Sequence, residues 1–311
     1  MAAVGQTQRR RRFNFGRRGG LAGYFFVAPS LVFLTVFVIL PIFAAFYYSL
    51  TDYDLMSSPE IAGWKNYKKL FDDDRFAHSI TNTLLFAFGT VPTGVTTSLA
   101  LAVLINRQIR GIYAYRALFY MPVVSSFVSV SLIWLWLYEP QFGLLNDLFE
   151  FIGLPRMKWL RSPDTSMLSI IIMSVWKNMG LNMVIYLAGL QGIPPHLYEA
   201  AEIDGAGGWN KFMKVTAPLL APTTFFVVIV YFIGALQMFV QVWVMTGDSS
   251  VDQGSKGGPL DSTLTVVVLL YVNAFEYLKM GYAAAMSFVL FLIIALITLI
   301  NVKFLSYESF S

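Results

Sequence analysis

Long apolar segments alternate with short polar ones along most of this 311-residue chain. Six apolar segments each exceed the roughly 20 residues that an α-helix needs to cross about 30 Å of hydrocarbon. They cover residues 22–50, 80–105, 116–138, 167–190, 217–245 and 280–305. A helix buried in a soluble core can also be apolar all round, but six such segments in one chain favour a membrane. The pattern therefore predicts an all-α integral membrane protein with about six transmembrane helices.

Composition and charge support this class and predict an orientation. Apolar residues make up 57% of the chain and charged residues 13%, against roughly 25% charged in an average soluble domain. Cytoplasmic loops of membrane proteins carry an excess of Lys and Arg. With both termini inside, the inner segments have a net charge of +8 and the outer segments −5. We therefore expect both termini, and the polar segment 198–218, to face the cytoplasm.

Residue types that carry catalysis are sparse. The chain has no cysteine, which excludes disulfides, thiolate metal sites and cysteine catalysis. Its two histidines, His78 and His196, fall on opposite sides of the membrane in this topology and cannot share a metal. No glycine-rich phosphate loop with its lysine is present, so ATP hydrolysis by that route is excluded. The sequence predicts a non-catalytic chain that binds no metal and no cofactor.

Several polar residues interrupt the fourth and fifth apolar segments. Contact with lipid is unfavourable for them, so we expect them to face a protein interior or a water-filled cavity. Hydrogen bonding between helices and a solute pathway are both compatible with this placement. A spacing of four predicts that Asn178 and Asn182 share one helix face and that Gln237 and Gln241 share another. Including a tryptophan whose flat ring suits a sugar, the candidate pathway residues are Trp176, Lys177, Asn178, Asn182, Gln237 and Gln241.

The polar segment 198–218 has the pattern of two short helices joined by a turn. Residues 199–204 are mostly good helix formers. Three glycines between positions 205 and 208 permit a sharp turn. Apolar residues then recur every three positions from Trp209, which predicts a second short helix with one apolar stripe. Two helices this short cannot bury themselves alone, so we expect the segment to dock on a partner.

The same segment carries a motif. It fits Glu-Ala-Ala-x-x-x-Gly followed, nine residues later, by Ile-x-Leu-Pro, with Val215 and Ala217 in place of Ile and Leu. This pattern marks permease subunits of binding-protein-dependent ABC importers, which the chain resembles. Flanking stretches such as 82–85 and 192–198 resemble the carbohydrate-uptake branch, in particular the first permease of maltose and glycerol-3-phosphate type systems.

The resemblance implies the fold and function of an ABC type I importer permease. Such a subunit forms half of the translocation pathway of an ATP-driven importer, here for sugars or sugar-like solutes, and segment 198–218 is its cytoplasmic coupling loop. The implied ATPase-coupling residues are Glu199, Ala200, Ala201, Asp204, Gly205, Val215 and Pro218. The implied partners are a second permease subunit, an ATPase dimer that carries ATP and Mg, and an extracytoplasmic solute-binding protein. The expected location is a bacterial or archaeal cytoplasmic (inner) membrane.

With this family in view, the chain divides into four parts. Residues 1–20 form a basic cytoplasmic tail, whose arginines we expect beside anionic lipid headgroups and not on nucleic acid. Residues 21–78 hold the first transmembrane helix and an outer loop with a short amphipathic helix near 66–74. Residues 79–305 form the core permease domain, including a turn-rich outer stretch at 246–279, and residues 306–311 form a cytoplasmic tail.

An ion- or proton-coupled secondary transporter of small polar solutes is the alternative function. Such a transporter would normally need intramembrane carboxylates or an ion site. Every Asp and Glu of the chain can be placed outside the six spans. The sequence therefore favours the importer subunit.

Overall fold

The computed structural model describes residues 19–106, 111–247 and 256–305. The expected N-terminal tail up to residue 18 and the C-terminal tail 306–311 lie outside these residues, as do Arg107 and Arg110, two of the basic residues counted in the inner segments. The chain forms two units, residues 1–47 and 48–311. In the first, α1 (Gly19–Leu34), the π-helix η1 (Thr35–Ile39) and the start of α2 (Leu40–Ser49) form a continuous apolar helix. Its apolar side chains from Tyr24 to Leu40 are exposed within this chain, as suits a helix that contacts lipid or another subunit.

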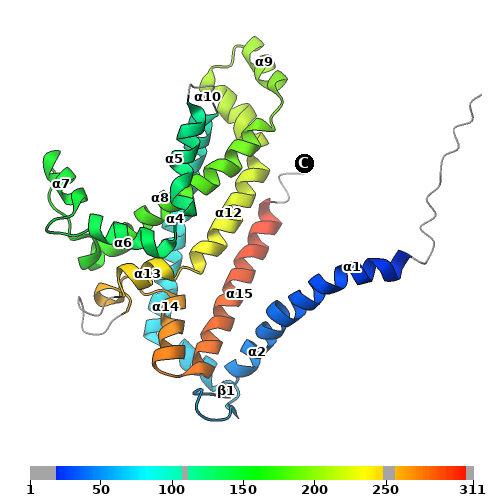
Figure 1. Cartoon of the computed structure of the whole chain (residues 1–311), viewed down its shortest axis with the longest axis vertical. Coiled ribbons are helices and arrows are strands. Elements are labelled where there is room, and N and C mark those ends of the chain that lie inside the picture. The colour runs from blue at the N-terminus through cyan, green and yellow to red at the C-terminus, as the bar shows by residue number, and fades with distance from the viewer. Residues whose placement is uncertain (1–18, 107–110, 248–255, 306–311) are drawn as a thin grey trace, which may run out of the picture. The chain divides into compact units, whose positions relative to one another are not determined.

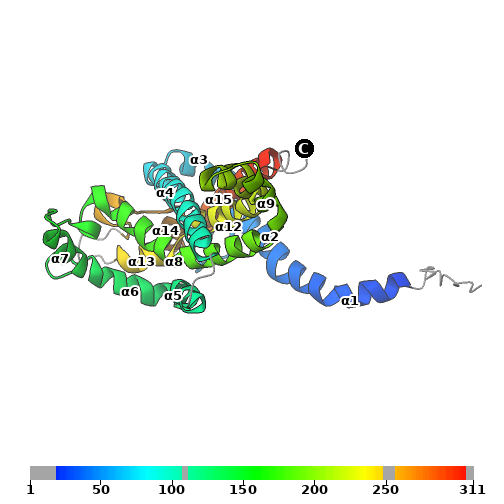
Figure 2. The ribbon, with the colours of Figure 1, turned by 90° about the horizontal axis from the view of Figure 1, so that it is seen from above.

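In the residues of the second unit that the structure describes, helices are joined by turns and loops, and the one sheet is a two-stranded antiparallel ladder. Its elements are β1 (Thr51–Asp52), β2 (Glu60–Ile61), α3 (Lys65–Phe71), α4 (Asp74–Ile105), α5 (Ile112–Val124), α6 (Phe127–Leu137), α7 (Leu144–Phe151), η2 (Trp159–Arg161), α8 (Pro163–Gln191), α9 (Pro195–Ile203), α10 (Gly208–Lys211), η3 (Phe212–Thr216), α11 (Ala217–Leu219), α12 (Ala221–Leu236), α13 (Val240–Met245), η4 (Pro259–Asp261), α14 (Val266–Tyr271), η5 (Val272–Glu276) and α15 (Met280–Leu305). Helices α9 and α10 lie at the end of this unit opposite to β1 and α14 (Figure 1). In both views, α6 and α7 lie on the far side of the unit from α15 (Figures 1 and 2).

The number of membrane-spanning segments agrees with the sequence. Among the described residues, four helices are long and apolar enough to cross a membrane, Tyr24–Ser49, Asp74–Ile105, Pro163–Gln191 and Met280–Lys303. Two bent helix pairs each add one more if the pair is taken as a single span. The predicted all-α membrane fold with about six spans is therefore confirmed.

Two of the expected spans are not single straight helices. The span predicted at 116–138 breaks between α5 and α6, which are bent by 100°. Ser125 is extended there (φ −70°, ψ 146°), and the hydroxyl of Ser126 caps α6 by accepting from Val128 N at 3.3 Å. The span predicted at 217–245 is bent by 65° between the 208–219 segment and α12, and α12 ends at Leu236.

The part of the expected outer stretch that the structure describes, residues 246–247 and 256–279, is also more ordered than its turn residues suggest. It contains α14 and the π-helix η5, an apolar segment over Val266–Glu276 that is too short to span a bilayer. Asn82 of α4 donates to the carbonyl oxygens of Asp261 and Leu264 at 2.8 and 3.1 Å. Thr83 accepts from Val266 N at 3.1 Å. These bonds fix α14 against α4 and explain how a turn-rich sequence is held in one conformation.

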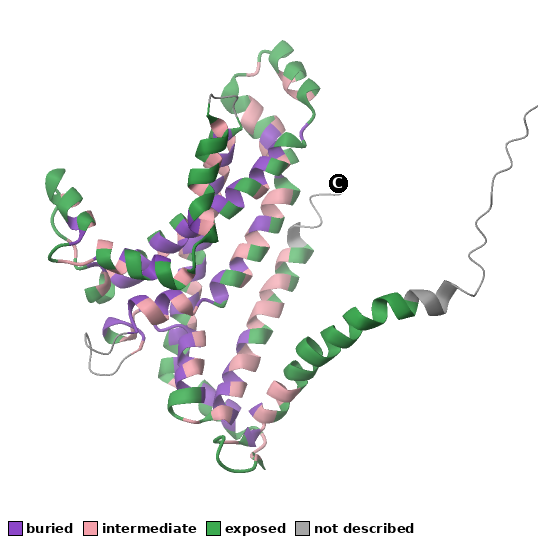
Figure 3. Ribbon diagram, viewed as in Figure 1, coloured by how far each residue is buried: buried purple, intermediate pink, exposed green. Residues whose placement is uncertain are grey.

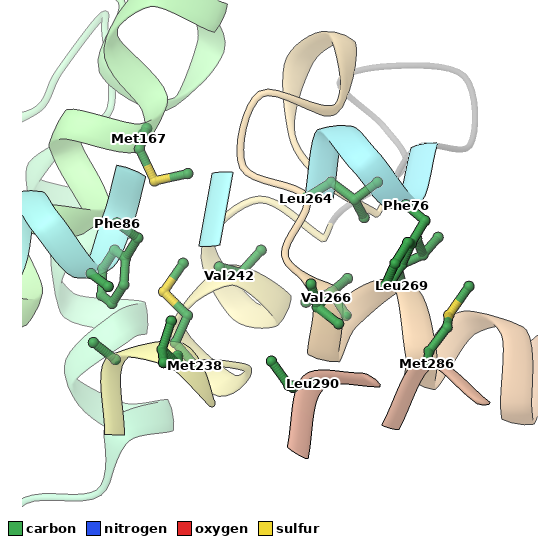
Figure 4. Packing of buried hydrophobic residues seen from close by; sticks show 14 of the residues in the cluster. Phe76, Phe86, Met167, Met238, Val242, Leu264, Val266, Leu269, Met286 and Leu290 are labelled. Atoms are coloured by element: carbon green, nitrogen blue, oxygen red, sulfur yellow. The ribbon is translucent and has the colours of Figure 1, made fainter. Parts of the chain in front are cut away.

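The main hydrophobic core lies where α4, α8, α13, α14 and α15 meet. Phe76 of α4 packs with Leu264 and Leu269, and Met286 and Leu290 of α15 complete that side (Figure 4). Buried residues concentrate at this junction, while the outward faces of the helices stay exposed (Figure 3). Helices in a bilayer associate through van der Waals packing of this kind, so this junction is the base from which the longer helices extend.

Candidate functional site

A cavity of about 220 Å³ lies among the central helices of the second unit. Three membrane-spanning helices, α4, α8 and α12, form most of its wall, and the first turns of α6 and α13 complete it. Its lining residues are Phe86, Thr90, Phe127, Asn178, Leu181, Asn182, Val230, Tyr231, Gly234, Ala235 and Gln241. The bend that follows α5 and the end of α12 are what bring α6 and α13 to the cavity.

Two polar atoms on the α4 and α8 walls of this cavity have no hydrogen-bond partner among the described residues. They are Oγ1 of Thr90, which is 0% exposed, and Nδ2 of Asn182, which is 6% exposed. A buried polar group without a partner costs ~1–3 kcal/mol. Such atoms are rare in folded proteins and call for a specific partner. Because both residues line the same cavity, we take it as a candidate site for a polar solute or for water.

The cavity wall combines amides and hydroxyls with aromatic rings. Asn178 donates through Nδ2 to Ser174 O at 2.8 Å, which leaves its amide oxygen as an acceptor. Phe86, Phe127 and Tyr231 supply aromatic surface. None of the lining residues is an Asp, Glu, Lys or Arg. The arrangement therefore suits an uncharged solute that offers hydroxyl groups and an apolar ring face.

The structure brings only three of the six predicted pathway residues to the cavity. Asn178 and Asn182 line it from one face of α8, as their spacing predicts, and Gln241 lines it from α13. Gln237 does not share a helix face with Gln241, because it caps the end of α12 while Gln241 lies in the next helix. The expected shared face is therefore wrong for that pair.

The other two predicted residues, Trp176 and Lys177, do not line the cavity. The ring of Trp176 packs edge-to-face on Trp134 at a centroid distance of 5.5 Å. Lys177 turns toward the α5–α6 break, where Nζ donates to Pro122 O at 2.9 Å and to Ser125 O at 2.8 Å. Sequence reasoning missed Phe86, Thr90 and the other apolar lining residues, since a threonine or phenylalanine inside an apolar helix carries no distinguishing signal.

The coupling loop, residues 198–218, folds as the two predicted short helices. Gly205 has a φ of +76° and joins α9 to the segment before α10, with Ala206 N donating to Ala201 O at 2.8 Å. Lys211 forms an ion pair with Glu202 at 2.6 Å, which ties the second short helix to the first. This hydrogen-bonded ammonium holds the pKa of the Glu202 carboxyl below its usual value. The pair is therefore present at neutral pH and is lost only as the pH falls through that lowered value.

A hollow of about 390 Å³ separates the two arms of the coupling loop. Five of the predicted coupling residues line it: Ala200, Ala201, Asp204, Gly205 and Val215. Glu199 is exposed on α9, and Pro218 lies in α11 just before the bend into α12. The large apolar side chains of Ile203 (87%), Trp209 (72%) and Met213 (50%) are exposed on the two arms of the loop.

The part of the chain that the structure describes holds no group of three or more His, Cys, Asp or Glu side chains that could bind a metal ion.

Comparison with known proteins places the chain in one family. Residues 19–304 match the family model described as "Binding-protein-dependent transport system inner membrane component". The chain is 35% identical over 294 residues to a probable ABC transporter permease protein, YesP, of Bacillus subtilis, with 94% of this chain and 92% of the relative covered. It is 34% identical over 284 residues to the lactose transport system permease protein LacF of Rhizobium radiobacter, with coverage of 90% and 92%.

A solved structure shares the fold. A chain of a bacterial alginate ABC transporter, crystallised in complex with an alginate pentasaccharide-bound periplasmic protein, matches with a TM-score of 0.80 at 20% identity. The match covers 94% of this chain and 96% of that one. These findings confirm the importer interpretation over an ion- or proton-coupled secondary transporter, and they confirm a non-catalytic subunit. The chain belongs to the family of binding-protein-dependent transport system inner membrane components, as a permease subunit of an ABC transporter.

Proposed function

We propose that this permease subunit drives uptake through its coupling loop, which docks on an ATPase subunit in the cytoplasm. The observation that carries the proposal is the exposure of three large apolar side chains, Ile203, Trp209 and Met213, in a loop whose two short helices are bridged by an ion pair. Large apolar side chains clustered on an exposed surface mark an interaction site. ATP and Mg belong to the ATPase dimer, whose closure would move this rigid loop and the helices attached to it.

Glu199 is the charged residue of the loop best placed to contact that partner. Its side chain is exposed and forms no ion pair or hydrogen bond with another described residue. Glu202, one helical turn away, is instead held by Lys211 within the loop. The chain therefore offers two nearby carboxylates, one free for a partner and one occupied.

Replacing Glu199 with glutamine should uncouple the subunit from its ATPase. A hydrogen bond to a charged group is worth ~1.5–3 kcal/mol, so we expect binding of the ATPase to weaken roughly tenfold or more. The measurement is co-purification of the ATPase from membranes, together with ATP hydrolysis stimulated by solute-loaded binding protein. Glu202→Gln is the matched control and should cause a smaller loss. Equal effects of the two substitutions would contradict the assignment of Glu199.

We further propose that the solute is an uncharged carbohydrate bound in the cavity. Amide and hydroxyl groups beside aromatic rings suit sugar hydroxyls and ring faces, and no charged residue lines the wall. The relatives include a lactose permease and an sn-glycerol-3-phosphate permease, so both neutral and charged solutes occur among them. The uncharged wall is what favours the neutral class here.

Replacing Asn182 with alanine should raise the KM for uptake without preventing assembly. Loss of one neutral hydrogen bond, worth ~0.5–1.5 kcal/mol, corresponds to a change of roughly two- to tenfold. The matched control is Asn301→Ala in α15, whose amide donates to Ile297 O within its own helix at 2.9 Å, away from the cavity. Radiolabelled sugar uptake in vesicles measures both variants. An unchanged KM in Asn182→Ala would assign the amide to helix packing instead.

The proposed assembly also contains a second permease subunit, which completes the pathway, and an extracytoplasmic solute-binding protein. Both termini lie in the cytoplasm in this proposal, since that topology places the basic segments inside. The same proposal divides the chain after residues 20, 78 and 305 into a cytoplasmic tail, the first span with its outer loop, the core permease domain and a second cytoplasmic tail. In this topology the second and the sixth span both run toward the cytoplasm. The directions of α4 and α15 support it, because both helices run toward the end where α9 and α10 lie (Figure 1).

A further inference from the structure

Lys177 is a buried cation in the middle of a membrane-spanning helix. It is 3% exposed and has no ion pair with another described residue. Its Nζ instead donates to two backbone carbonyl oxygens, Pro122 O at 2.9 Å and Ser125 O at 2.8 Å. It also lies 4.4 Å from the centre of the Phe127 ring. A lysine at this depth is costly unless it is paired, so these contacts identify what its charge stabilises.

The two carbonyl groups belong to a helix end that lies within an apolar span. Helix α5 ends at Val124, and the chain turns by 100° before α6 begins. The last carbonyls of any helix lack donors from a following turn, and hydrocarbon supplies no water to replace them. An ammonium group offers three donors, and its positive charge is favoured at a helix C-terminus. Lys177 thus satisfies carbonyl groups that the break leaves unpaired.

A second feature of α8 holds α5 at the same place. Gly180 lies one turn beyond Lys177, and a Cβ atom at this position would overlap the backbone carbonyl oxygen of Phe119. The backbones of α8 and α5 therefore approach closely where the lysine reaches the break. This close approach keeps Nζ within hydrogen-bond distance of both carbonyl oxygens.

The break determines where Phe127 lies. Phe127 is the first residue of α6 and the residue through which α6 lines the cavity. Its ring faces the Lys177 ammonium, and a cation near an aromatic face contributes ~0.5–2 kcal/mol. From these contacts we propose that Lys177 is a positioning residue, which holds the α5–α6 break and fixes Phe127 as a wall of the solute cavity without contacting the solute. The link to solute binding rests on the proposed function, whereas the role at the break does not.

The angle between α5 and α6 gives a readout that is independent of transport. The chain has no native cysteine, so within this chain spin labels attach only at introduced cysteines. Met121 of α5 and Ile133 of α6 are 65% and 60% exposed, and labels there report the distance across the break. The measurement is made on the assembled transporter in lipid without solute, in the parent and in Lys177→Met and Lys177→Arg.

We expect a single narrow distance distribution in the parent and in Lys177→Arg, because arginine keeps donors for both carbonyl groups. Lys177→Met should shift and broaden the distribution and raise the KM for uptake roughly tenfold or more, as loss of hydrogen bonds from a charged group implies. If Lys177→Met does not accumulate, Lys177→Gln, which keeps one neutral donor group, should show an intermediate distribution.

An unchanged distribution in Lys177→Met would overturn the proposal. A raised KM with an unchanged distribution would also overturn it, since Lys177 would then act on the solute directly. A shifted distribution with an unchanged KM would overturn the link to Phe127. Failure of the proposed carbohydrate function would leave the distance result standing, so the two hypotheses are separable.

Discussion

Replacing Gly205 with proline should abolish uptake while the chain still inserts into the membrane. Gly205 has a φ of +76°, and proline fixes φ near −65°. The substitution also removes the hydrogen bond from Gly205 N to Glu202 O at 3.0 Å. The arms of the coupling loop can then no longer enclose the hollow that separates them. If this distortion weakens coupling to the ATPase by more than ~1.4 kcal/mol, uptake falls at least tenfold.

Milder substitutions at Gly205 should rank by their tolerance of positive φ. Asparagine enters the left-handed region more readily than alanine, so uptake should fall in the order Asn, Ala, Pro. Gly207 provides the matched control, since its φ is −67° and an added Cβ meets no atom within 4 Å. Gly207→Ala should therefore support near-parental uptake, whereas Gly205→Ala should not.

Uptake by the Gly205 variants is compared at equal amounts of chain in the membrane, together with ATP hydrolysis by the purified complex. Normal uptake in Gly205→Pro would mean that the conformation of this turn has no part in coupling. Equal losses in Gly205→Ala and Gly207→Ala would mean that small size, and not positive φ, is what the loop requires.

The spans and the coupling loop could be predicted because each depends on local signals. Apolar length determines whether a helix can cross a bilayer, and the glycine at 205 indicates a turn that the structure confirms. The break between α5 and α6 has no comparable local signal. Pro122 lies inside α5 without ending it, and Ser125 and Ser126 are short gaps in an apolar run. The break depends on a lysine 52 residues or more away along the chain.

The cavity was predictable only in part for the same reason. Asn178 and Asn182 stand out because amides are unfavourable in lipid, and their spacing within one helix places them together. Thr90 and Tyr231 reach the same cavity from α4 and α12, yet neither residue is unusual in an apolar helix. Which helix faces which neighbour is decided by long-range packing. The pairing of Gln237 with Gln241 fails because α12 ends at Leu236 and α13 begins only at Val240, so no single helix carries both residues.

Replacing Gly180 with alanine should destabilise the chain even though alanine is the better helix former. Alanine in place of glycine inside a helix gains ~1 kcal/mol. At Gly180, however, the new Cβ would overlap the carbonyl oxygen of Phe119 and lie 3.1 Å from Cγ2 of Val123. Overpacking costs ~1–3 kcal/mol and occasionally more. Backbone atoms yield less readily than a flexible side chain, so the clash outweighs the gain in helix propensity.

Replacing Gly234 of α12 with alanine separates the gain in helix propensity from the cost of the steric clash. Gly234 also lies in a membrane-spanning helix at the cavity, but an added Cβ there meets no atom within 4 Å. Gly234→Ala should therefore keep or raise the unfolding temperature of the purified chain, while Gly180→Ala lowers it, with intrinsic tryptophan fluorescence as the measurement. Gly180→Ala should also weaken uptake, because moving α5 away from α8 draws Pro122 and Ser125 out of reach of Lys177. Equal unfolding temperatures for the two variants would mean that α5 and α8 do not pack as closely as the geometry at Gly180 requires.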